Sequence, residues 1–278
     1  MQDVEIAVCA LQRSGHHAIL EWIHAMLVEE YGSAADVVWV NWVNEHAQQL
    51  DPFNTLFDGA EQHRKLGAES RHTPRRALMY NFEDSGVHML QSALHYSDRY
   101  VGPSTSKIGV LILRDFYNML ASRLRRTRDG KPFSSDYLAA AGMWAEQAKL
   151  FSLRTRHHYD LGDFIAISYN DWWLSAEYRI KLAERLGLRY TENTRDTVHY
   201  AGFGSSFGQV EHAHELKVLD RWEEFKDDAE YIDIVDRCLE ARVYGDSIFG
   251  WHLEPDSNGT LRLVPYQNTN GVRHGAGL

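Results

Sequence analysis

The chain has 278 residues and a formal net charge of −10, and hydrophobic residues make up 44% of it. This is the composition of a globular protein, and the acidic balance excludes a nucleic-acid binder that depends on overall positive charge. Two cysteines are too few for a disulfide framework, and no apolar stretch reaches the ~18 residues of a membrane span, so we expect a cytoplasmic protein.

The N-terminal residues have the pattern of a strand, a tight turn and a helix. The apolar run at 4–11 predicts a buried strand. After the turn, apolar residues recur at the spacing of one helix face up to a stop at Gly32. These residues are Ile19, Trp22, Ile23, Met26 and Leu27.

Further apolar runs alternate with helical segments along the chain. Strands are predicted at 37–43, 77–82, 107–115 and 164–171. Helices are predicted directly after the third run, around 135–153, and from an N-cap at Ser175 to a C-terminal glycine at Gly187. This alternation predicts an α/β three-layer sandwich around a mainly parallel sheet, in which ligands bind at the carboxyl ends of the strands.

The last part of the chain has a different pattern. Helical periodicity is present at 216–225 and 229–245, and from Glu254 the polar composition predicts a poorly ordered tail. We therefore expect one domain over 1–252 and a polar C-terminal tail over 253–278.

The first turn, Q-R-S-G-H-H-A at 12–18, favours binding of an anion. Backbone N–H groups at a helix N-terminus lack partners and carry partial positive charge. Gly15 allows close approach, Ser14 offers a hydroxyl, and Arg13 adds a fixed charge. The turn lacks the lysine of a nucleoside-triphosphatase P-loop. The alternative is a surface turn whose Arg13 is merely solvated.

A second cation lies at the end of the run at 107–115. Arg114 ends this strand, and Ser122 follows eight residues later. Arg114 faces the same sheet edge as Arg13, so the two arginines could hold opposite ends of one polyanion. Taken alone, Arg114 with Asp115 is equally well interpreted as a structural ion pair.

In combination the motifs resemble those of the sulfotransferases that use 3'-phosphoadenosine 5'-phosphosulfate (PAPS). Q-R-S-G-H-H-A stands where that family binds the 5'-phosphosulfate, and R-D-F-Y-N-M-L-A-S stands where it binds the 3'-phosphate, with phenylalanine in place of proline. The stretches I-S-Y-N-D, G-S-S-F and L-D-R-W resemble later segments of the family. The resemblance covers about residues 4–251.

The resemblance implies a P-loop-containing nucleotide hydrolase-like (sulfotransferase) fold with PAPS as the sulfuryl donor. It assigns donor contacts to residues of the turn, the second motif and the later segments. These residues are Arg13, Ser14, Gly15, His16, His17, Ala18, Arg114, Ser122, Tyr169, Ser205, Ser206 and Phe207.

The reaction also needs a group that takes the proton of the acceptor. In the family this group is a histidine or glutamate on an early strand or just after it. Glu83, at the end of the run at 77–82, is the first candidate and His46 the second, with Asp84 and His88 behind them. Arg13 would stabilise the charge that develops on the leaving phosphate.

The adjacent histidines His16 and His17 stand where the family has serine or threonine. An imidazole N–H of His17 could replace a hydroxyl donor to the phosphosulfate. No H-E-x-x-H or C-x-x-C spacing occurs, so no metal is expected.

The sequence thus predicts a sulfotransferase whose acceptor is a hydroxyl or amine of a small molecule or carbohydrate, with no nucleic-acid partner. Two alternatives stay open. The strand-turn-helix also suits a P-loop-type kinase, and the hydroxyls missing at 16 and 17 also suit a catalytically inactive nucleotide-binding protein.

Overall fold

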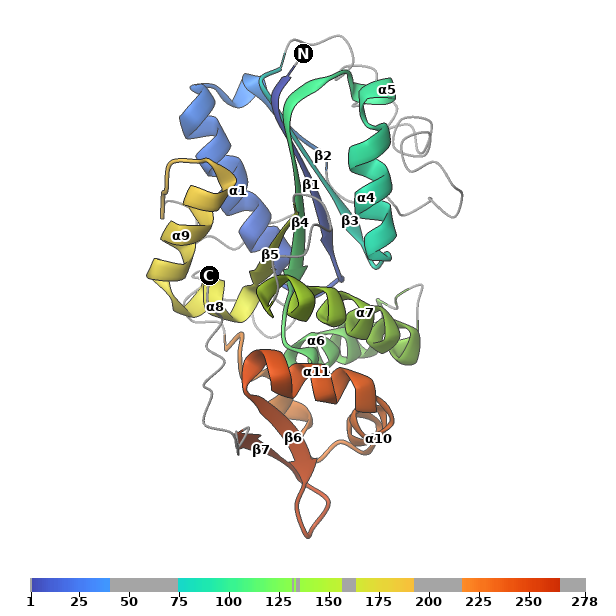
Figure 1. Cartoon of the computed structure of the whole chain (residues 1–278). Coiled ribbons are helices and arrows are strands. Elements are labelled where there is room, and N and C mark those ends of the chain that lie inside the picture. The colour runs from blue at the N-terminus through green and yellow to red at the C-terminus, as the bar shows by residue number, and fades with distance from the viewer. Residues whose placement is uncertain are drawn as a thin grey trace.

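A five-stranded parallel sheet forms the centre of the protein (Figure 1). The structure is a computed structural model that describes residues 2–40, 75–131, 133, 136–156, 164–192 and 217–265. The strand order is β2-β3-β1-β4-β5. The strands are β1 (Gln2–Ala10), β2 (Val37–Val40), β3 (Ala77–Glu83), β4 (Ser104–Leu113) and β5 (Phe164–Ser168).

Helices cover both faces of this sheet (Figure 1). On one face lie α1 (His16–Tyr31) and α9 (Ala176–Leu186), and on the other lie α4 (Val87–Tyr96) and α7 (Tyr137–Arg156). Side chains alternate along β1, so Val8 packs in the cluster on the α1 face while Cys9 packs in the cluster on the α4 face. The predicted three-layer sandwich with a parallel sheet is confirmed.

The predicted helix ends are also confirmed where glycine supports a left-handed backbone. Helix α1 ends at Gly32 with φ 81°, and α9 ends at Gly187 with φ 69°. The hydroxyl of Ser175 accepts the N–H of Tyr178 and so caps α9. No helix in the described part of the chain combines the length and apolarity that crossing a bilayer requires.

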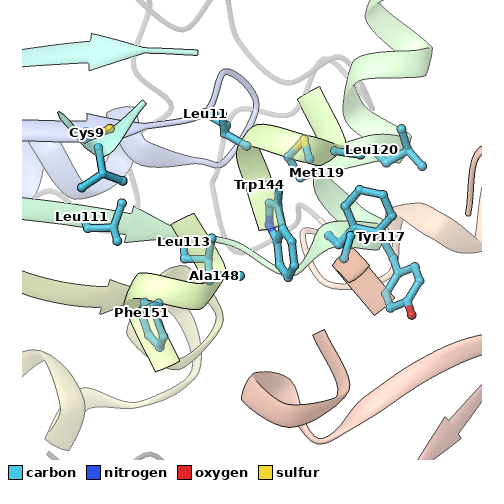
Figure 2. Packing of buried hydrophobic residues seen from close by; sticks show 14 of the residues in the cluster. Cys9, Leu11, Leu111, Leu113, Tyr117, Met119, Leu120, Trp144, Ala148 and Phe151 are labelled. Carbon is cyan, nitrogen blue, oxygen red and sulfur yellow. The ribbon is translucent and has the colours of Figure 1, made fainter. Parts of the chain in front are cut away.

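A second group of helices lies beyond the carboxyl ends of the strands. It consists of α6 (Phe116–Arg128), α10 (Ala229–Arg237) and α11 (Leu239–Phe249), with the short helices α5 (Asp98–Val101) and α8 (Tyr169–Leu174) elsewhere in the fold. Figure 2 shows Trp144 of α7 between Leu113 at the end of β4 and Tyr117 of α6. The Trp144 indole N–H donates to the carbonyl of Arg114 at 2.8 Å. Packing therefore fixes the backbone directly after β4.

Two predicted elements end earlier than the sequence suggests. The strand predicted over 164–171 ends at Ser168, because the Ser168 hydroxyl accepts the N–H of Asp171 and starts α8. The single helix predicted over 229–245 is interrupted at Cys238, whose ψ of 53° is not helical. The segment predicted as helical over 216–225 contains a short 3-10 helix, Arg221–Phe225.

The tail predicted from Glu254 is wrong for residues up to 265, which belong to an antiparallel hairpin. Strands β6 (Trp251–Pro255) and β7 (Leu261–Pro265) pair, and Leu253 and Leu261 are buried in the core. The Asp256 carboxylate accepts N–H groups of Asn258 and Thr260 and holds the turn. These two leucines, with Trp251 packed against the core, anchor the hairpin, although its turn is polar.

A buried carboxylate lies in the central strand. Glu5 has no exposed surface, and it accepts hydrogen bonds from the Tyr80 hydroxyl at 2.7 Å and the Ser104 hydroxyl at 2.7 Å. Burial raises the pKa of Tyr80 well above its ordinary value, and the neighbouring Glu5 adds to this. Tyr80 therefore stays a donor.

Replacing Tyr80 by phenylalanine is expected to lower the free energy of unfolding by about 1–3 kcal/mol, since it leaves one oxygen of Glu5 without its donor. Urea unfolding measures this difference. Tyr96→Phe is the control, because Tyr96 is 41% exposed and its change is expected to stay within about 0.5 kcal/mol. Equal losses in the two variants would contradict the role of the hydroxyl.

Candidate functional site

The candidate site lies where β1, β3 and β4 end side by side. Ala10 pairs with Glu83 on one side and with Ile112 on the other. Because the strands are parallel, the turn after β1, the end of β3 and Arg114 after β4 meet at one edge of the sheet.

The turn after β1 has an unusual backbone. Gly15 precedes α1 with φ 78°, and Arg13 has φ 70°, which is rare for a residue with a side chain. Among the described residues no side chain caps α1, and the first turn of this helix carries no acidic residue. The positive end of a 16-residue helix therefore faces this turn, as binding of an anion requires.

Gly15 lies directly against an aromatic ring. A Cβ atom added at Gly15 would lie 2.3 Å from Cε2 of Tyr169, the first residue of α8. The guanidinium carbon of Arg114 also lies over the Tyr169 ring, 5.0 Å from its centroid. The structure thus brings together Gly15, Arg114 and Tyr169, which the sequence placed in one site.

At the nucleotide site that the sequence predicts, Gly15→Ala is expected to lower the affinity by about tenfold, which is 1.4 kcal/mol, because the Cβ displaces the Tyr169 ring. Isothermal titration calorimetry with 3'-phosphoadenosine 5'-phosphate measures it. Gly32→Ala is the matched control: Gly32 has φ 81° but no atom within 4 Å of an added Cβ, so it carries the backbone strain alone. The same loss of affinity in both variants would contradict the contact.

Arg114 is buried, with 1% of its surface exposed. Its guanidinium donates to the carbonyl of Arg13 at 3.3 Å and to the carbonyl of Val218. Its Nε is buried and has no hydrogen-bond partner among the described residues. Asp115 does not provide one, since its carboxylate accepts from Asn118 and Asn170. The structure therefore does not support the interpretation of Arg114 and Asp115 as a structural ion pair.

Ser122 lies next to an arginine that the sequence analysis did not select. The Ser122 hydroxyl accepts from the Arg221 guanidinium at 2.7 Å and donates to the carbonyl of Asn118 at 2.9 Å. The Asn118 side chain in turn accepts the backbone N–H of Arg221 at 2.7 Å. The motif L-D-R-W contains Arg221, which is 99 residues from Ser122 in the sequence. Only the fold brings the two side chains together.

The arginines raise the positive potential of the site. Burial lowers the pKa of Arg13 to about 10, with further contributions from the positive charges of Arg126 and Arg114. Burial lowers the pKa of Arg221 well below its ordinary value, and Arg114 and Arg13 lower it further. Cations that repel one another in a buried place gain stability when an anion binds between them.

Glu83 binds the two adjacent histidines at the start of α1. His16 Nε2 lies 2.8 Å and His17 Nε2 3.5 Å from the same oxygen, Oε1 of Glu83. The other ring nitrogen of His16 lies 3.1 Å from the Ser14 hydroxyl. Burial by itself would raise the pKa of Glu83, but the two histidines outweigh it and hold this pKa below its ordinary value. Glu83 is therefore a carboxylate at neutral pH.

These three side chains also have the spacing of metal ligands, with one ligand atom each within 4.8 Å of the others. The surrounding charge opposes a cation, because the positive end of α1 lies here and Arg13 is close enough for its charge to interact with Glu83. The positive potential around His16, His17 and Glu83 therefore disfavours binding of a metal ion at these three side chains.

Asp84 is held by a different partner. Its carboxylate forms two bonds with the guanidinium of Arg123, at 2.8 and 2.9 Å, and accepts the N–H of Gln12 at 2.9 Å. Asp84 has φ 49°, a second strained backbone at this edge. Asp84 thus fixes the turn after β1, and its charge is already neutralised by Arg123.

Several predicted residues lie outside the described part of the chain. These residues are His46, Ser205, Ser206 and Phe207, and their assignments stay predictions. Ala18 lies in the first turn of α1, where its N–H donates to the carbonyl of Gly15 at 3.1 Å. His88 is exposed on α4.

Comparison with known proteins gives likeness in structure only. No family model and no curated protein matches the chain. The chain is similar to the sulfotransferase domain of the Synechococcus PCC 7002 olefin synthase, with 12% identity, a TM-score of 0.49, and coverage of 88% of this chain and 94% of that one.

Two further solved structures match with lower TM-scores. The sulfotransferase domain from the curacin biosynthetic pathway has 15% identity, a TM-score of 0.45, and coverage of 85% and 97%. A chain of the PezAT toxin-antitoxin system of Streptococcus pneumoniae has 13% identity, a TM-score of 0.36, and coverage of 86% and 88%. Two of the three are sulfotransferase domains.

Proposed function

We propose that the protein is a sulfotransferase that takes a sulfuryl group from PAPS and transfers it to a hydroxyl or amine of a small-molecule or carbohydrate acceptor. The observation that carries this proposal is the cluster of Arg13, Arg114 and Arg221 beside the strained turn before α1. Such a cluster fits a ligand with two separate anionic groups.

The residues present fit this donor at two places. The N–H groups before α1, with Arg13, suit the phosphosulfate. The unpartnered Nε of Arg114 and the bonded pair of Ser122 and Arg221 suit the 3'-phosphate. Each place has positive charge and hydrogen-bond donors.

When bound, PAPS would supply a sulfuryl group on a phosphate leaving group. Arg13 would stabilise the charge that collects on that phosphate, which is the main electrostatic requirement of such a transfer. The site contributes positioning through Arg114 and Ser122, which hold the far end of the donor.

The kinase alternative finds less support. A P-loop kinase needs a lysine after the glycine of the turn, and His16 stands there with its ring bound to Ser14 and Glu83. The turn therefore lacks the lysine that contacts the transferred phosphate in a P-loop kinase.

Binding and transfer experiments test the proposal. Calorimetry is expected to show tight binding of 3'-phosphoadenosine 5'-phosphate and at least tenfold weaker binding of adenosine 5'-phosphate, which lacks the 3'-phosphate. Incubation with sulfur-labelled PAPS and a panel of hydroxylated acceptors is then expected to give labelled product. Binding without transfer to any acceptor would favour the inactive nucleotide-binding protein. Stabilisation by ATP with magnesium, and none by 3'-phosphoadenosine 5'-phosphate, would refute the proposal.

A further inference from the structure

A pocket of about 400 Å³ lies between α10, the first turn of α11 and the hairpin of β6 and β7. These elements form the lower end of the molecule in Figure 1. The residues that line the pocket differ from those of the candidate functional site. They are Ala229, Ile232, Asp233, Val235, Asp236, Arg242, Leu253, Pro255 and Leu261.

Two regular elements form the walls of this pocket. On α10, the lining positions 229, 232, 233 and 236 recur at the spacing of one helix face. On the hairpin, Leu253 pairs with Leu263 and Pro255 pairs with Leu261, and paired residues point to the same face of a sheet. Leu263 therefore continues the wall that Leu253, Pro255 and Leu261 form.

The pocket is mainly apolar and its floor is fixed. Six of its nine lining residues are apolar, and three of these, Val235, Leu253 and Leu261, belong to the buried core. Ala229, Asp233 and Asp236 are exposed, so the pocket opens to the surface. A preformed apolar pocket of this volume with a few charged groups at its edge has the properties of a binding site.

The same elements expose large apolar side chains. Leu263 is 44% exposed on the pocket wall, and Leu239 and Val243, one turn apart on α11, are 64% and 57% exposed next to Arg242 in the sequence. Apolar side chains that gather at the surface beside a pocket are typical of an interface with another protein. A small ligand would fill the pocket but would leave these side chains in water.

The charge of this part of the chain indicates the sign of the partner. Residues 217–265 contain 12 acidic and 6 basic residues. At the pocket, Asp233 pairs with Arg237 at 3.2 Å and Asp236 with Arg242 at 3.6 Å, and the two aspartate side chains are 62% and 76% exposed. Ion pairs this exposed contribute little to stability, so both carboxylates can exchange their partners for a cation of another protein.

We infer that this pocket is a docking site for a basic segment of a partner protein. The segment inserts an apolar side chain into the pocket and places lysine or arginine side chains beside Asp233 and Asp236. A second copy of this chain fits less well, because two surfaces with an acidic excess repel each other. The inference goes beyond the proposed function and does not depend on it.

The first experiment tests the charge and the apolar character of the partner. Two labelled amphipathic peptides of equal length, one of leucine and lysine and one of leucine and glutamate, are titrated with the full chain, and fluorescence anisotropy gives the Kd. The lysine peptide is expected to bind at least tenfold more tightly. Its affinity is expected to fall at least threefold when the salt concentration rises tenfold, because exposed charges are screened.

The second experiment locates the binding with variants. Ala229 is the exposed first residue of α10, so Ala229→Phe fills the pocket without removing a core side chain, and it is expected to weaken binding of the lysine peptide at least tenfold. Asp233→Asn combined with Asp236→Asn is expected to weaken it at least fivefold. Leu174→Ser is the matched control: Leu174 is 68% exposed on α8, and its loss is expected to change the Kd less than twofold.

The other occupants appear as distinct results. Equal affinity for the two peptides, no binding of the lysine peptide, or unchanged binding in Ala229→Phe would overturn the inference. Binding of the uncharged dye Nile red that Ala229→Phe abolishes, without binding of the lysine peptide, would overturn it in favour of a small apolar ligand. Self-association in sedimentation that Ala229→Phe abolishes would overturn it in favour of a second copy. Because these measurements need no nucleotide, failure of the proposed function leaves them valid.

Discussion

Arg114→Ala is expected to weaken binding of 3'-phosphoadenosine 5'-phosphate by about 100-fold, since a charge-assisted hydrogen bond contributes about 1.5–3 kcal/mol. Arg114 is buried at the end of β4, and its Nε has no partner among the described residues. The guanidinium lies over the Tyr169 ring and is buried, so little side-chain entropy is lost when an anion binds. Calorimetry measures the Kd, and the KM for PAPS should rise by a similar factor.

Two controls accompany Arg114→Ala: a nucleotide that lacks the 3'-phosphate and a variant of an arginine at the surface. Adenosine 5'-phosphosulfate lacks the 3'-phosphate, so wild type and Arg114→Ala are expected to bind it within about threefold of each other. Arg128 ends α6 and is paired with Asp228 and Glu230 at the surface. Arg128→Ala should leave the affinities for both nucleotides unchanged. Equal losses for both nucleotides would mean that Arg114 only supports the turn through its bonds to backbone carbonyls.

The sequence was sufficient for the parts of the fold that local rules determine. The strand, turn and helix around Gly15 follow from an apolar run, a glycine and a helical periodicity within 32 residues, and the structure confirms them. The cap at Ser175 and the stop at Gly187 are equally local. The parallel sheet followed because strands alternate with helices, and this arrangement leaves few topologies.

The site was predictable as far as each residue belongs to a motif. The structure brings Arg13, Gly15, Arg114 and Tyr169 together, and the order of strands explains why. Arg221 was missed because its motif has no spacing rule that relates it to Ser122, and the contact depends on a return of the chain past α6.

The surroundings of Glu83 also depend on residues that are far away in the sequence. Its place at a strand end was visible in the sequence, but its partner His16 lies 67 residues away. Whether a carboxylate acts as a base depends on which donors surround it, and donors are brought together by tertiary packing. The sequence therefore located the group, but its contacts with His16 and His17 are visible only in the structure.

The hairpin at 251–265 was missed for a physical reason too. Residues 256–260 between its strands are polar or glycine and interrupt the apolar pattern, whereas Leu253 and Leu261 are buried in the core and Trp251 packs against it. Pairing of β6 with β7 satisfies the backbone, so such a segment is ordered once a core is available to cover these side chains.

Arg13→Ala is expected to lower kcat by about 100-fold, while the Kd of 3'-phosphoadenosine 5'-phosphate changes less than tenfold. The reason is position: Arg13 lies in the turn before α1, where the leaving phosphate would collect charge. Arg221 lies beside Ser122, and with Arg114 it would hold the other end of the proposed donor. Steady-state kinetics with saturating PAPS measures kcat. A normal kcat combined with a large loss of donor affinity would contradict this division between the arginines.

The pH dependence of the same residue gives an independent test. Burial and the nearby arginines lower the pKa of Arg13 to about 10, so its charge is complete below that pH and is lost above it. The kcat/KM for PAPS is therefore expected to fall as the pH rises through about 10. Arg13→Lys keeps the charge at neutral pH, but the ordinary pKa of lysine is about two units below that of arginine, so this alkaline limb should move to lower pH. An alkaline limb that is unchanged in Arg13→Lys would show that another group controls it.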